Sequence, residues 1–497
     1  RVVSDAATRE YYANDVFWQP GIPPLAIVLP RTIEEAAEAV RLTTDAGLSV
    51  VPRGGGMSYS KGYLPDRADS VVVDTRKLDR IVEVNTDDRY ITVEAGCTWE
   101  KLNEALEGSG LRTGYWGPLS GVNATVGGAL SQNSAFFGSA LNGVVADSVI
   151  GVTVILADGR SVTTGSGGRI GAKPFTRYGG PDLTGMFLGD NGAFGLKVAA
   201  TLKLWPRPRE TGFLSFGFTT MNAMAAAQVE MARKRLVAEG FVVDRSKAEH
   251  SVSVNRISDG LKTLGNVAAG GKTLVKGIKD AVGVAVAGTA FLKAHNFTLH
   301  IVTEANSPAE LEAALSQLRA IGNRHGAEIE NTVPKVMRSK LFGPVRGMLG
   351  LNGERWVPIH AVFPLSDAQK VVDANEAWTP KEAIRRLHAY RDAGHDILWI
   401  EDPCLRDDYE GLRQVSEAVP FAHINTGEYL DLAGKRRLIA GRGVDILNVH
   451  GRISDVLRAA WLAAEYGVRV SLGNTFLEIG VQRAAALPEA DWLEFSF

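Results

Sequence analysis

The sequence predicts two different architectures in succession. The first is an α+β region of two α/β subdomains followed by an α+β domain, and the second is a partial parallel β/α barrel of TIM type. A predicted strand ends in three successive glycines within Pro52–Ser58. From Val371 onward, strands and amphipathic helices alternate in the rhythm of a β/α barrel. In that second region carboxylates follow successive strands, in the segments VDAN, WIEDP and NTGEY.

The composition is that of a globular protein with two or three domains. The 497 residues are 45% hydrophobic and 22% charged, with a formal net charge of −2. Charge therefore favours neither nucleic acid nor an anionic membrane as a partner. The two cysteines, Cys97 and Cys404, argue against a disulfide framework and for a reducing compartment such as the cytoplasm.

No targeting or membrane-spanning segment is expected. No signal peptide is visible, and the sequence begins with Arg1 rather than methionine, which is compatible with a missing upstream piece. The longest apolar run, Ala281–Leu292, is shorter than the roughly 20 residues needed to cross a bilayer. Lysines flank this run, so it could rest on a membrane surface, but a buried segment of a substrate domain is the preferred interpretation.

The first elements lead to the glycine-rich loop. Thr32 and Glu35 form a capping box that opens a helix, and Gly47 fits the left-handed end of that helix. The strand Leu48–Val51 then ends at Pro52–Ser58, where glycines allow positive φ and bring N–H groups up to an anion. A hairpin turn with a purely structural role would explain the same glycines equally well.

The segments that follow favour the anion-binding interpretation, because their order and spacing are specific when taken together. They are the strands Ser70–Asp74 and Tyr90–Gly96, the helix Trp99–Leu106, the small-residue segment Gly121–Gly128, a hairpin over Asp147–Gly159, and the loop Gly189–Gly195 before the strand Leu196–Leu204.

This ordered set resembles the PCMH-type FAD-binding domain of the vanillyl-alcohol oxidase and D-lactate dehydrogenase family of FAD-linked oxidoreductases, over roughly residues 20–206. The resemblance implies FAD between two subdomains, its pyrophosphate held by the Arg53–Ser58 loop. Met57 stands where many relatives have a histidine that links FAD, so a covalent link from this loop is excluded. The cofactor-binding residues that the resemblance implies are Pro52, Arg53, Gly54, Gly55, Gly56, Met57, Ser58, Gly121, Thr125, Gly127, Gly128, Asp147, Ile150, Val152 and Gly195.

Residues 207–370 resemble the substrate-covering cap domain of the same family, so the expected domains are 1–206, 207–370 and 371–497. Asn296–Thr303 alternates like a half-buried strand, and Ser307–His325 begins with a capping box. Gly353–Leu365 is the stretch most similar to the cap. Its His360 is a candidate base or flavin partner, although a lone histidine in an apolar strand is more often a core residue.

The C-terminal region places three acids at one edge of its predicted sheet. Asp373, Glu401 and Glu428 each follow a predicted strand, and the carboxyl ends of barrel strands are where catalytic groups gather. Three converging carboxylates repel one another unless a hard divalent cation holds them, so the pattern predicts a Mg²⁺ site. Singly, each acid would be a solvated surface group.

These segments resemble the barrel of the enolase superfamily, closest to its mandelate racemase branch. The resemblance implies that Asp373, Glu401 and Glu428 bind Mg²⁺. It implies that Asp445 is the aspartate of an Asp–His dyad, and that Glu494 hydrogen-bonds an enolate intermediate. Two departures weaken a catalytic role. The expected dyad histidine is replaced near Asn474, and the strand that carries the lysine base of the superfamily does not precede VDAN.

The two resemblances meet near Val371 without a linker, so the sequence predicts a chimera of two folded units rather than an evolved bifunctional enzyme. Three functions are compatible with it: an FAD-dependent oxidase or dehydrogenase of a 2-hydroxy acid or related alcohol, a Mg²⁺-dependent acid-sugar dehydratase or racemase, and a non-catalytic cofactor-binding chain. A small-molecule substrate is expected. The electron acceptor, a covalent link to FAD from another domain, and the oligomeric state are left open.

Overall fold

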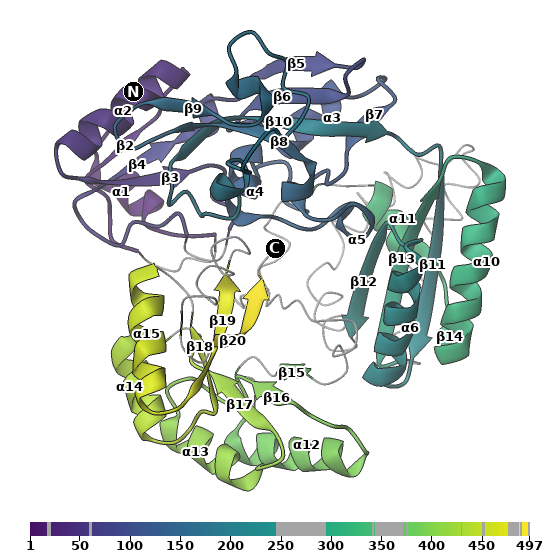
Figure 1. The fold of residues 1–497 in the computed structure, drawn as a ribbon. Coiled ribbons are helices and arrows are strands. Elements are labelled where there is room, and N and C mark those ends of the chain that lie inside the picture. The colour runs from purple at the N-terminus through teal and green to yellow at the C-terminus, as the bar shows by residue number, and fades with distance from the viewer. Residues whose placement is uncertain are drawn as a thin grey trace. The chain divides into compact units, whose positions relative to one another are not determined.

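The chain divides into two compact units, Arg1–Val357 and Pro358–Phe497, and each is described by itself. This division lies before Val371, where the sequence indicated the change. The computed structural model (Figure 1) describes residues 1–16, 21–58, 62–244, 295–339, 342, 371–373, 376, 378–428, 430–449, 453–475, 487 and 490–495. Of Asp373, Asn474 and Glu494 only the backbone is described.

The first unit begins with a small α/β layer. Its four-stranded sheet has the order β1-β2-β4-β3, in which β2, β4 and β3 are parallel and β1 is antiparallel. The predicted capping box is present, since Thr32 accepts the Glu35 N–H and opens helix α2. The elements are β1 (Val2–Val3), α1 (Ala6–Tyr12), β2 (Ala26–Val28), α2 (Ile33–Asp45), β3 (Ser49–Arg53) and β4 (Ser70–Asp74).

The second layer is antiparallel, which corrects the expectation of a second α/β subdomain. The long strand β10 pairs with β6, β7 and β8, all antiparallel, in a sheet of order β5-β6-β10-β8-β9. The predicted hairpin with its turn at Gly159 is confirmed as β8–β9. The elements are β5 (Ile81–Asn85), β6 (Tyr90–Glu94), α3 (Trp99–Ala105), β7 (Leu111–Thr113), α4 (Val126–Gln132), α5 (Ser139–Asn142), β8 (Val149–Ile155), β9 (Ser161–Thr163) and β10 (Leu196–Pro206).

The cap is an antiparallel sheet with helices α6 and α10 on one face, as expected for an α+β domain. Its strand order is β12-β13-β11-β14. Leu214, Phe216, Leu299 and Ile301 pack against helix residues such as Leu318, so the alternate residues of β11 and β13 face the other side. The elements are β11 (Glu210–Phe218), α6 (Met221–Lys234), β12 (Glu239–Asp244), β13 (Phe297–Ala305), α10 (Pro308–His325), β14 (Ala327–Glu328) and α11 (Thr332–Ser339).

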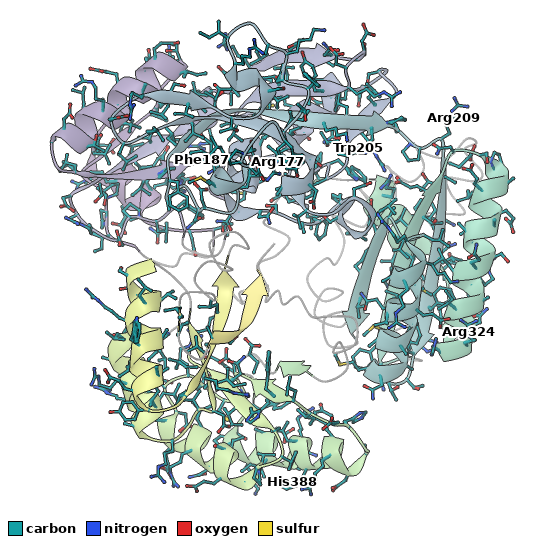
Figure 2. The ribbon with its side chains drawn as sticks, viewed as in Figure 1. Arg177, Phe187, Trp205, Arg209, Arg324 and His388 are labelled. Carbon is teal, nitrogen blue, oxygen red and sulfur yellow. The ribbon has the colours of Figure 1, made fainter. Side chains whose placement is uncertain are left out.

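The C-terminal unit contains a parallel sheet whose order, β15 to β20, follows the chain, as the barrel prediction requires. Helices α12 and α13 are joined by His388, labelled in Figure 2, which donates to the Ala418 carbonyl at 3.0 Å. The described sheet has six strands, whereas a closed barrel of this type has eight. The elements are β15 (Val371–Asp373), α12 (Pro380–Asp392), β16 (Trp399–Glu401), α13 (Tyr409–Ala418), β17 (His423–Thr426), α14 (Leu432–Ala440), β18 (Ile446–Val449), α15 (Ile453–Glu465), β19 (Arg469–Thr475) and β20 (Ala490–Phe495).

Both cysteines are buried and unpaired, as predicted. Burial raises the pKa of Cys97 and of Cys404 to about 12, so both thiols stay protonated near neutral pH. Across the part of the chain that the structure describes, every helix is too short or too polar to cross a membrane. The apolar run Ala281–Leu292 lies outside the described residues.

Candidate functional sites

The glycine-rich loop after β3 lies directly against the segment that opens α4. A Cβ atom on Gly54 would lie 2.4 Å from Thr125 Oγ1, and one on Gly55 would lie 2.0 Å from the Asn123 carbonyl oxygen. Gly56 has a φ of +66°, a left-handed conformation that favours glycine. The three glycines are therefore required for the close approach of two loops as well as for the turn.

This loop presents a row of unused backbone donors. The N–H groups of Gly54, Gly55, Gly56 and Met57 donate no hydrogen bond to another described residue, and all four residues are half-buried. Successive N–H groups of this kind form a concave anion-binding surface. A phosphate group held here would supply the acceptors that the protein itself does not.

The side chains at the start of the loop contact other parts of the protein. Arg53 is buried, its guanidinium lies 4.7 Å from the ring centre of Tyr12 and 4.6 Å from that of Tyr63, and it donates to the Tyr12 carbonyl at 3.1 Å. Pro52 has no N–H, and its ring lies against Gly192. These contacts brace the start of the loop, and the predicted cofactor contacts of Pro52 and Arg53 stay a prediction.

Two further loop residues are tied to neighbouring elements. Met57 packs against the core of the antiparallel layer. Ser58 donates through Oγ to Gln132 Oε1 of α4 at 3.0 Å. The loop is therefore anchored at its end as well as at its beginning, and only its central amides remain for a ligand.

The N–H groups in the first turn of α4 already donate hydrogen bonds within the protein. Gly127 donates its N–H to the Ala95 carbonyl at 2.8 Å, and Gly128 donates to the N-cap oxygen of Thr125 at 3.3 Å. A Cβ on Gly127 would lie 2.7 Å from that of Ala95, which explains this glycine by helix–strand packing. Gly121 likewise uses its N–H within the loop, bonding the Pro118 carbonyl at 3.0 Å. The N–H groups of Gly121, Gly127 and Gly128 are therefore used within the protein, and the predicted proximity of these residues to FAD stays a prediction.

Polar groups at and before β8 also form hydrogen bonds within the protein. Asp147 is exposed and accepts the Val144 N–H at 2.9 Å, so its carboxylate closes a turn. Val152 donates its N–H to Thr164 Oγ1 at 3.0 Å, and the Ile150 carbonyl lies against Gly165. The Asp147 carboxylate and the Val152 N–H are therefore used within the protein, and the predicted cofactor contacts of Asp147, Ile150 and Val152 stay a prediction.

Gly195 has a packing role. A Cβ at this position would lie 2.4 Å from Val154 Cγ1, so the glycine allows β10 to start close to β8. The preceding loop is organised by Asp190, which is buried, accepts the Gly192 N–H at 3.0 Å and pairs with buried Lys197. The small residues of this segment are explained by an internal charge pair and close packing.

A buried charge network connects the antiparallel layer to the cap sheet, and the sequence did not predict it. Arg112 of β7 binds Glu304 of β13 through two contacts of 2.7 and 2.5 Å, and Arg338 of α11 pairs with both Glu304 and Glu239. Both guanidinium groups lie over the Trp116 ring, at 5.3 and 4.2 Å from its centre. No local pattern marks these residues, since Arg112 and Glu304 are 192 positions apart.

The two glutamates of this network are held in different states. Burial raises the pKa of Glu239 to about 7, against the opposing charge of Arg338. For Glu304 burial also opposes ionisation, but hydrogen bonds and charge from Arg112 and Arg338 outweigh it and lower the pKa. Because both arginines are already paired, they stiffen the cap boundary and offer no free positive charge to a substrate.

The described histidine of the cap sheet is His300 rather than the predicted His360, which lies outside the described residues. His300 is fully buried, with Ser215 Oγ 2.9 Å from Nδ1 and Thr298 Oγ1 3.0 Å from Nε2. Burial lowers its pKa to about 4, so the ring is neutral near neutral pH.

In the C-terminal unit the structure brings the predicted acids to one edge of the sheet. Asp373 ends β15 and is in register with Glu401, which ends β16 and is in register with Asn425 of β17. Glu401 is 2% exposed and accepts a hydrogen bond of 3.0 Å from Asn448 Nδ2 of β18. The alternate strand residues pack against the helices, so Glu401 and Asn448 lie on the opposite face of the sheet.

Glu428 follows β17 in a loop held by a buried lysine. Lys435 of α14 donates to the carbonyls of Gly427 and Leu430 at 2.5 and 2.6 Å. Burial lowers its pKa to about 8, although Glu428 and Asp431 oppose the shift. Glu428 itself is 3% exposed. The positions of Asp373, Glu401 and Glu428 at strand ends are confirmed for the backbone.

Asp445 lies at the opposite edge, which contradicts its expected place in a catalytic dyad. It precedes β18, and its Oδ2 accepts the Ile424 N–H at the start of β17 at 2.8 Å. The amino ends of parallel strands are far from the carboxyl ends, where catalytic groups of such sheets gather, so Asp445 has a structural role here. Glu494 lies near the carboxyl end of β20, and its predicted role stays a prediction.

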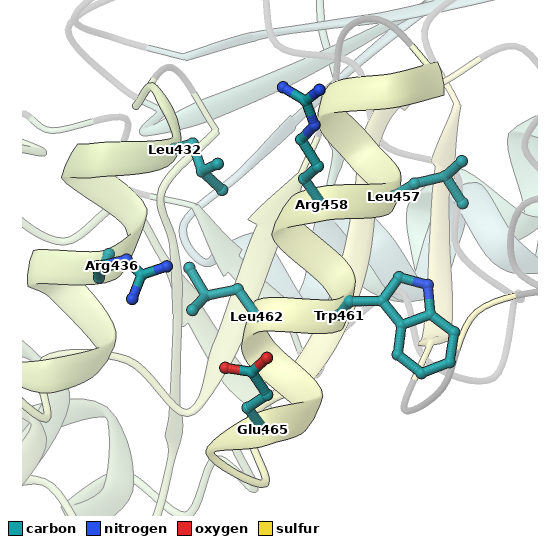
Figure 3. A pocket seen from close by; sticks show the side chains of 7 residues that line it. All are labelled: Leu432, Arg436, Leu457, Arg458, Trp461, Leu462 and Glu465. Carbon is teal, nitrogen blue, oxygen red and sulfur yellow. The ribbon is translucent and has the colours of Figure 1, made fainter.

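Among the described side chains, no group of three His, Cys, Asp or Glu residues is arranged to hold a metal ion, and the side chain of Asp373 is not among them. A groove of about 360 Å³ on the outer helices α14 and α15 is lined by Leu432, Arg436, Leu457, Arg458, Trp461, Leu462 and Glu465 (Figure 3). None of the predicted site residues lines it, because it lies on the helices and not on the polar face of the sheet.

Comparison with known families agrees with the two folds. Residues 24–165 match the family described as FAD binding domain, and residues 360–497 match the family described as Enolase C-terminal domain-like. The chain joins an FAD-binding domain to an enolase C-terminal domain. His360 is the first residue of the second match, so its assignment to the flavoprotein cap is wrong.

The curated relatives match only the flavoprotein part. D-lactate dehydrogenase [cytochrome] 1 of Saccharomyces cerevisiae is 30% identical over 44% of this chain and 36% of its own length. The glycolate oxidase subunit GlcD of Bacillus subtilis is 28% identical over 46% of this chain and 47% of its own length. The chain thus spans less than half the length of these relatives.

Solved structures support the same fold. The 4-ethylphenol oxidase from Gulosibacter chungangensis has a TM-score of 0.57 at 16% identity, covering 79% of this chain and 75% of its own. A p-cresol methylhydroxylase has a TM-score of 0.54 at 16% identity, covering 69% and 66%. At this identity the likeness concerns the fold alone. The enolase assignment of the C-terminal part depends on its family match.

Proposed function

We propose that the N-terminal unit is an FAD-dependent oxidoreductase that oxidises a CH–OH group, with a 2-hydroxy acid or a related alcohol as substrate. The observation that carries the proposal is the row of four unused N–H groups from Gly54 to Met57, pressed against α4 by glycines that tolerate no Cβ. The named relatives, a D-lactate dehydrogenase and a glycolate oxidase subunit, support the substrate class.

The residues of this chain bind and orient in this proposal. The Gly54–Met57 amides hold the pyrophosphate, while Arg53, fixed by Tyr12 and Tyr63, keeps the loop in place. FAD, when bound, supplies the acceptor for the hydride that leaves the substrate carbon. The paired Arg112 and Glu304 fix the cap sheet against the flavin domain, so that the cap can keep water from the reacting carbon.

The experiment is a visible absorption spectrum of the purified chain, taken before and after acid precipitation. Flavin bands that remain in the supernatant indicate bound, non-covalent FAD, and colour in the pellet indicates a covalent link. Anaerobic addition of D-lactate, glycolate or 4-ethylphenol should then bleach the flavin with the 2-hydroxy acids and not with the phenol. A soluble chain that stays colourless with added FAD refutes the proposal.

We further propose that the C-terminal unit holds a divalent cation, Mg²⁺ by the chemistry of its ligands, with Asp373, Glu401 and Glu428. Two observations favour this. Glu401 and Glu428 are 2% and 3% exposed, and Asp373 is in register with Glu401 on the adjacent strand. Carboxylates that gather at one edge of a sheet repel one another unless a cation lies between them, and all-oxygen ligands suit Mg²⁺. The cation would hold these acids together and would polarise an oxygen-bearing substrate.

Cation binding is tested separately from flavin chemistry. We expect the full chain to bind one Mn²⁺, a paramagnetic substitute for Mg²⁺, and the Glu401→Gln variant to lose this binding. An acid-sugar dehydratase or racemase reaction would need a base in addition, and the described residues around Glu401 do not support one.

A further inference from the structure

A fully buried asparagine lies beside the acids of the C-terminal sheet. Asn425 of β17 is 0% exposed, and among the residues that the structure describes neither its Oδ1 nor its Nδ2 has a hydrogen-bond partner. Buried polar groups are paired in the great majority of cases, and leaving an amide unpaired costs free energy. An unpaired buried amide therefore indicates that something else occupies its surroundings.

The place of Asn425 in the sheet shows what that occupant would meet. Asn425 of β17 is in register with Glu401 of β16. Strand β17 lies between β16 and β18, so the hydrogen bond from Asn448 of β18 to Glu401 crosses over β17. The neighbours Ile424 and Leu447 belong to the helix-facing core, so Glu401, Asn425 and Asn448 share the other face. The unpaired amide lies in the same polar row as the proposed cation ligand.

We infer that Asn425 is a further residue of this cation site, its Oδ1 accepting a hydrogen bond from a water bound to the cation. A cation with bound water offers the donors that the Asn425 oxygen lacks, and an oxygen of the same ligand sphere can accept from Nδ2. This inference rests on the proposed cation site at Asp373, Glu401 and Glu428. It adds a neutral residue that the carboxylate pattern does not contain.

The test is Mn²⁺ binding to the full chain, followed by the loss of the free-ion signal in electron paramagnetic resonance. Asn425→Leu keeps the size of the side chain and removes both polar atoms. We expect Mn²⁺ affinity to fall about tenfold, as for other residues that support metal ligands. In excess chelator the same variant should unfold at the wild-type temperature or above it, because the unpaired amide is gone.

Two variants keep the outcome interpretable. His423→Leu, at the exposed amino end of β17 and away from the strand end that carries the acids, should leave Mn²⁺ affinity unchanged. If Asn425→Leu does not fold, Asn425→Asp serves instead. Its extra carboxylate should lower stability in chelator and increase the stabilisation by Mn²⁺ beyond that of the wild type.

The outcomes separate the two proposals. If the wild type binds no Mn²⁺, the cation site itself fails. If the wild type binds Mn²⁺ and Glu401→Gln abolishes binding while Asn425→Leu binds as well as the wild type, only the role of Asn425 fails. In that case the Asn425 amide forms its hydrogen bonds with an internal water that is not bound to the cation.

Discussion

The substitution Gly55→Ala tests the anion-binding loop most directly. The new Cβ would lie 2.0 Å from the Asn123 carbonyl oxygen and 2.9 Å from its carbon, whereas ordinary contacts begin at 3.4 Å. Both obstructing atoms belong to the backbone, so no side-chain rotation relieves the clash. The loop must withdraw from the start of α4 by roughly 1.4 Å, the difference between 3.4 and 2.0 Å.

A displacement of this size breaks at least one hydrogen bond to a bound phosphate. Hydrogen bonds to charged groups contribute about 1.5–3 kcal/mol, and about 1.4 kcal/mol corresponds to a factor of ten in affinity. We therefore expect FAD to bind about tenfold to a hundredfold more weakly. Overpacking of this kind also lowers stability by about 1–3 kcal/mol, which leaves a folded protein for the measurement.

The assay is titration of the flavin-free chain with FAD, followed by the change in flavin fluorescence. Gly179→Ala is the matched control, since a Cβ there meets nothing within 4 Å. It should bind FAD as the wild type does. A Gly55→Ala variant with unchanged FAD affinity and an unchanged circular-dichroism spectrum would show that the Gly54–Met57 amides do not hold the cofactor.

Two further predictions concern stability. Lys435 has a pKa of about 8 in the fold against roughly 10.4 when unfolded. Between about pH 8 and roughly pH 10.4 the lysine is protonated in the unfolded chain and neutral in the folded one. The free energy of unfolding of the C-terminal unit should therefore rise by about 3 kcal/mol as pH increases through this range. Urea unfolding at several pH values should show this rise in the wild type and not in Lys435→Met; an equal rise in both would contradict it. Arg338→Met leaves buried Glu239 without its partner and should lower the stability of the N-terminal unit by about 3 kcal/mol, whereas Arg324→Met, in an exposed pair with Glu230, should cost under about 1 kcal/mol. If calorimetry gives equal losses of stability for the two variants, the buried network stabilises the protein no more than the exposed pair does.

The helices could be predicted because their start signals are local. Thr32, Thr98 and Ser307 each accept the N–H three residues later, and these helices begin within one residue of the predicted position. The parallel order of β15 to β20 also followed from the alternation of strands and helices. Pairing between distant antiparallel strands has no such signal. The contacts of β10 with β6, β7 and β8 join segments far apart in sequence, so the second layer was predicted with the wrong topology.

The network around Trp116 shows a second limit. Arg112, Glu239, Glu304 and Arg338 come from four different elements, and each alone resembles an ordinary surface charge. Only the cap sheet packing brings them together and buries them. A pairing of this kind has no periodicity to detect, and knowledge of the family does not supply it either.

The two proposed sites differ in which atoms would bind the ligand, and so in what the sequence could predict about them. In the loop after β3 the proposed donors are backbone amides. The glycines that expose them could be identified, but nothing in the sequence showed that the amides of Gly127, Gly128 and Val152 are bonded within the protein. In the C-terminal sheet the proposed ligands are side chains at strand ends, and the alternation of strands and helices predicted correctly that Glu401 ends a strand. It placed Asp445 wrongly because an acid before a strand and an acid after one look alike until the strand boundary is known. Asn425 was not predicted as a site residue, because an asparagine inside a strand belongs to no motif. Only its burial without a hydrogen-bond partner among the described residues indicates a role.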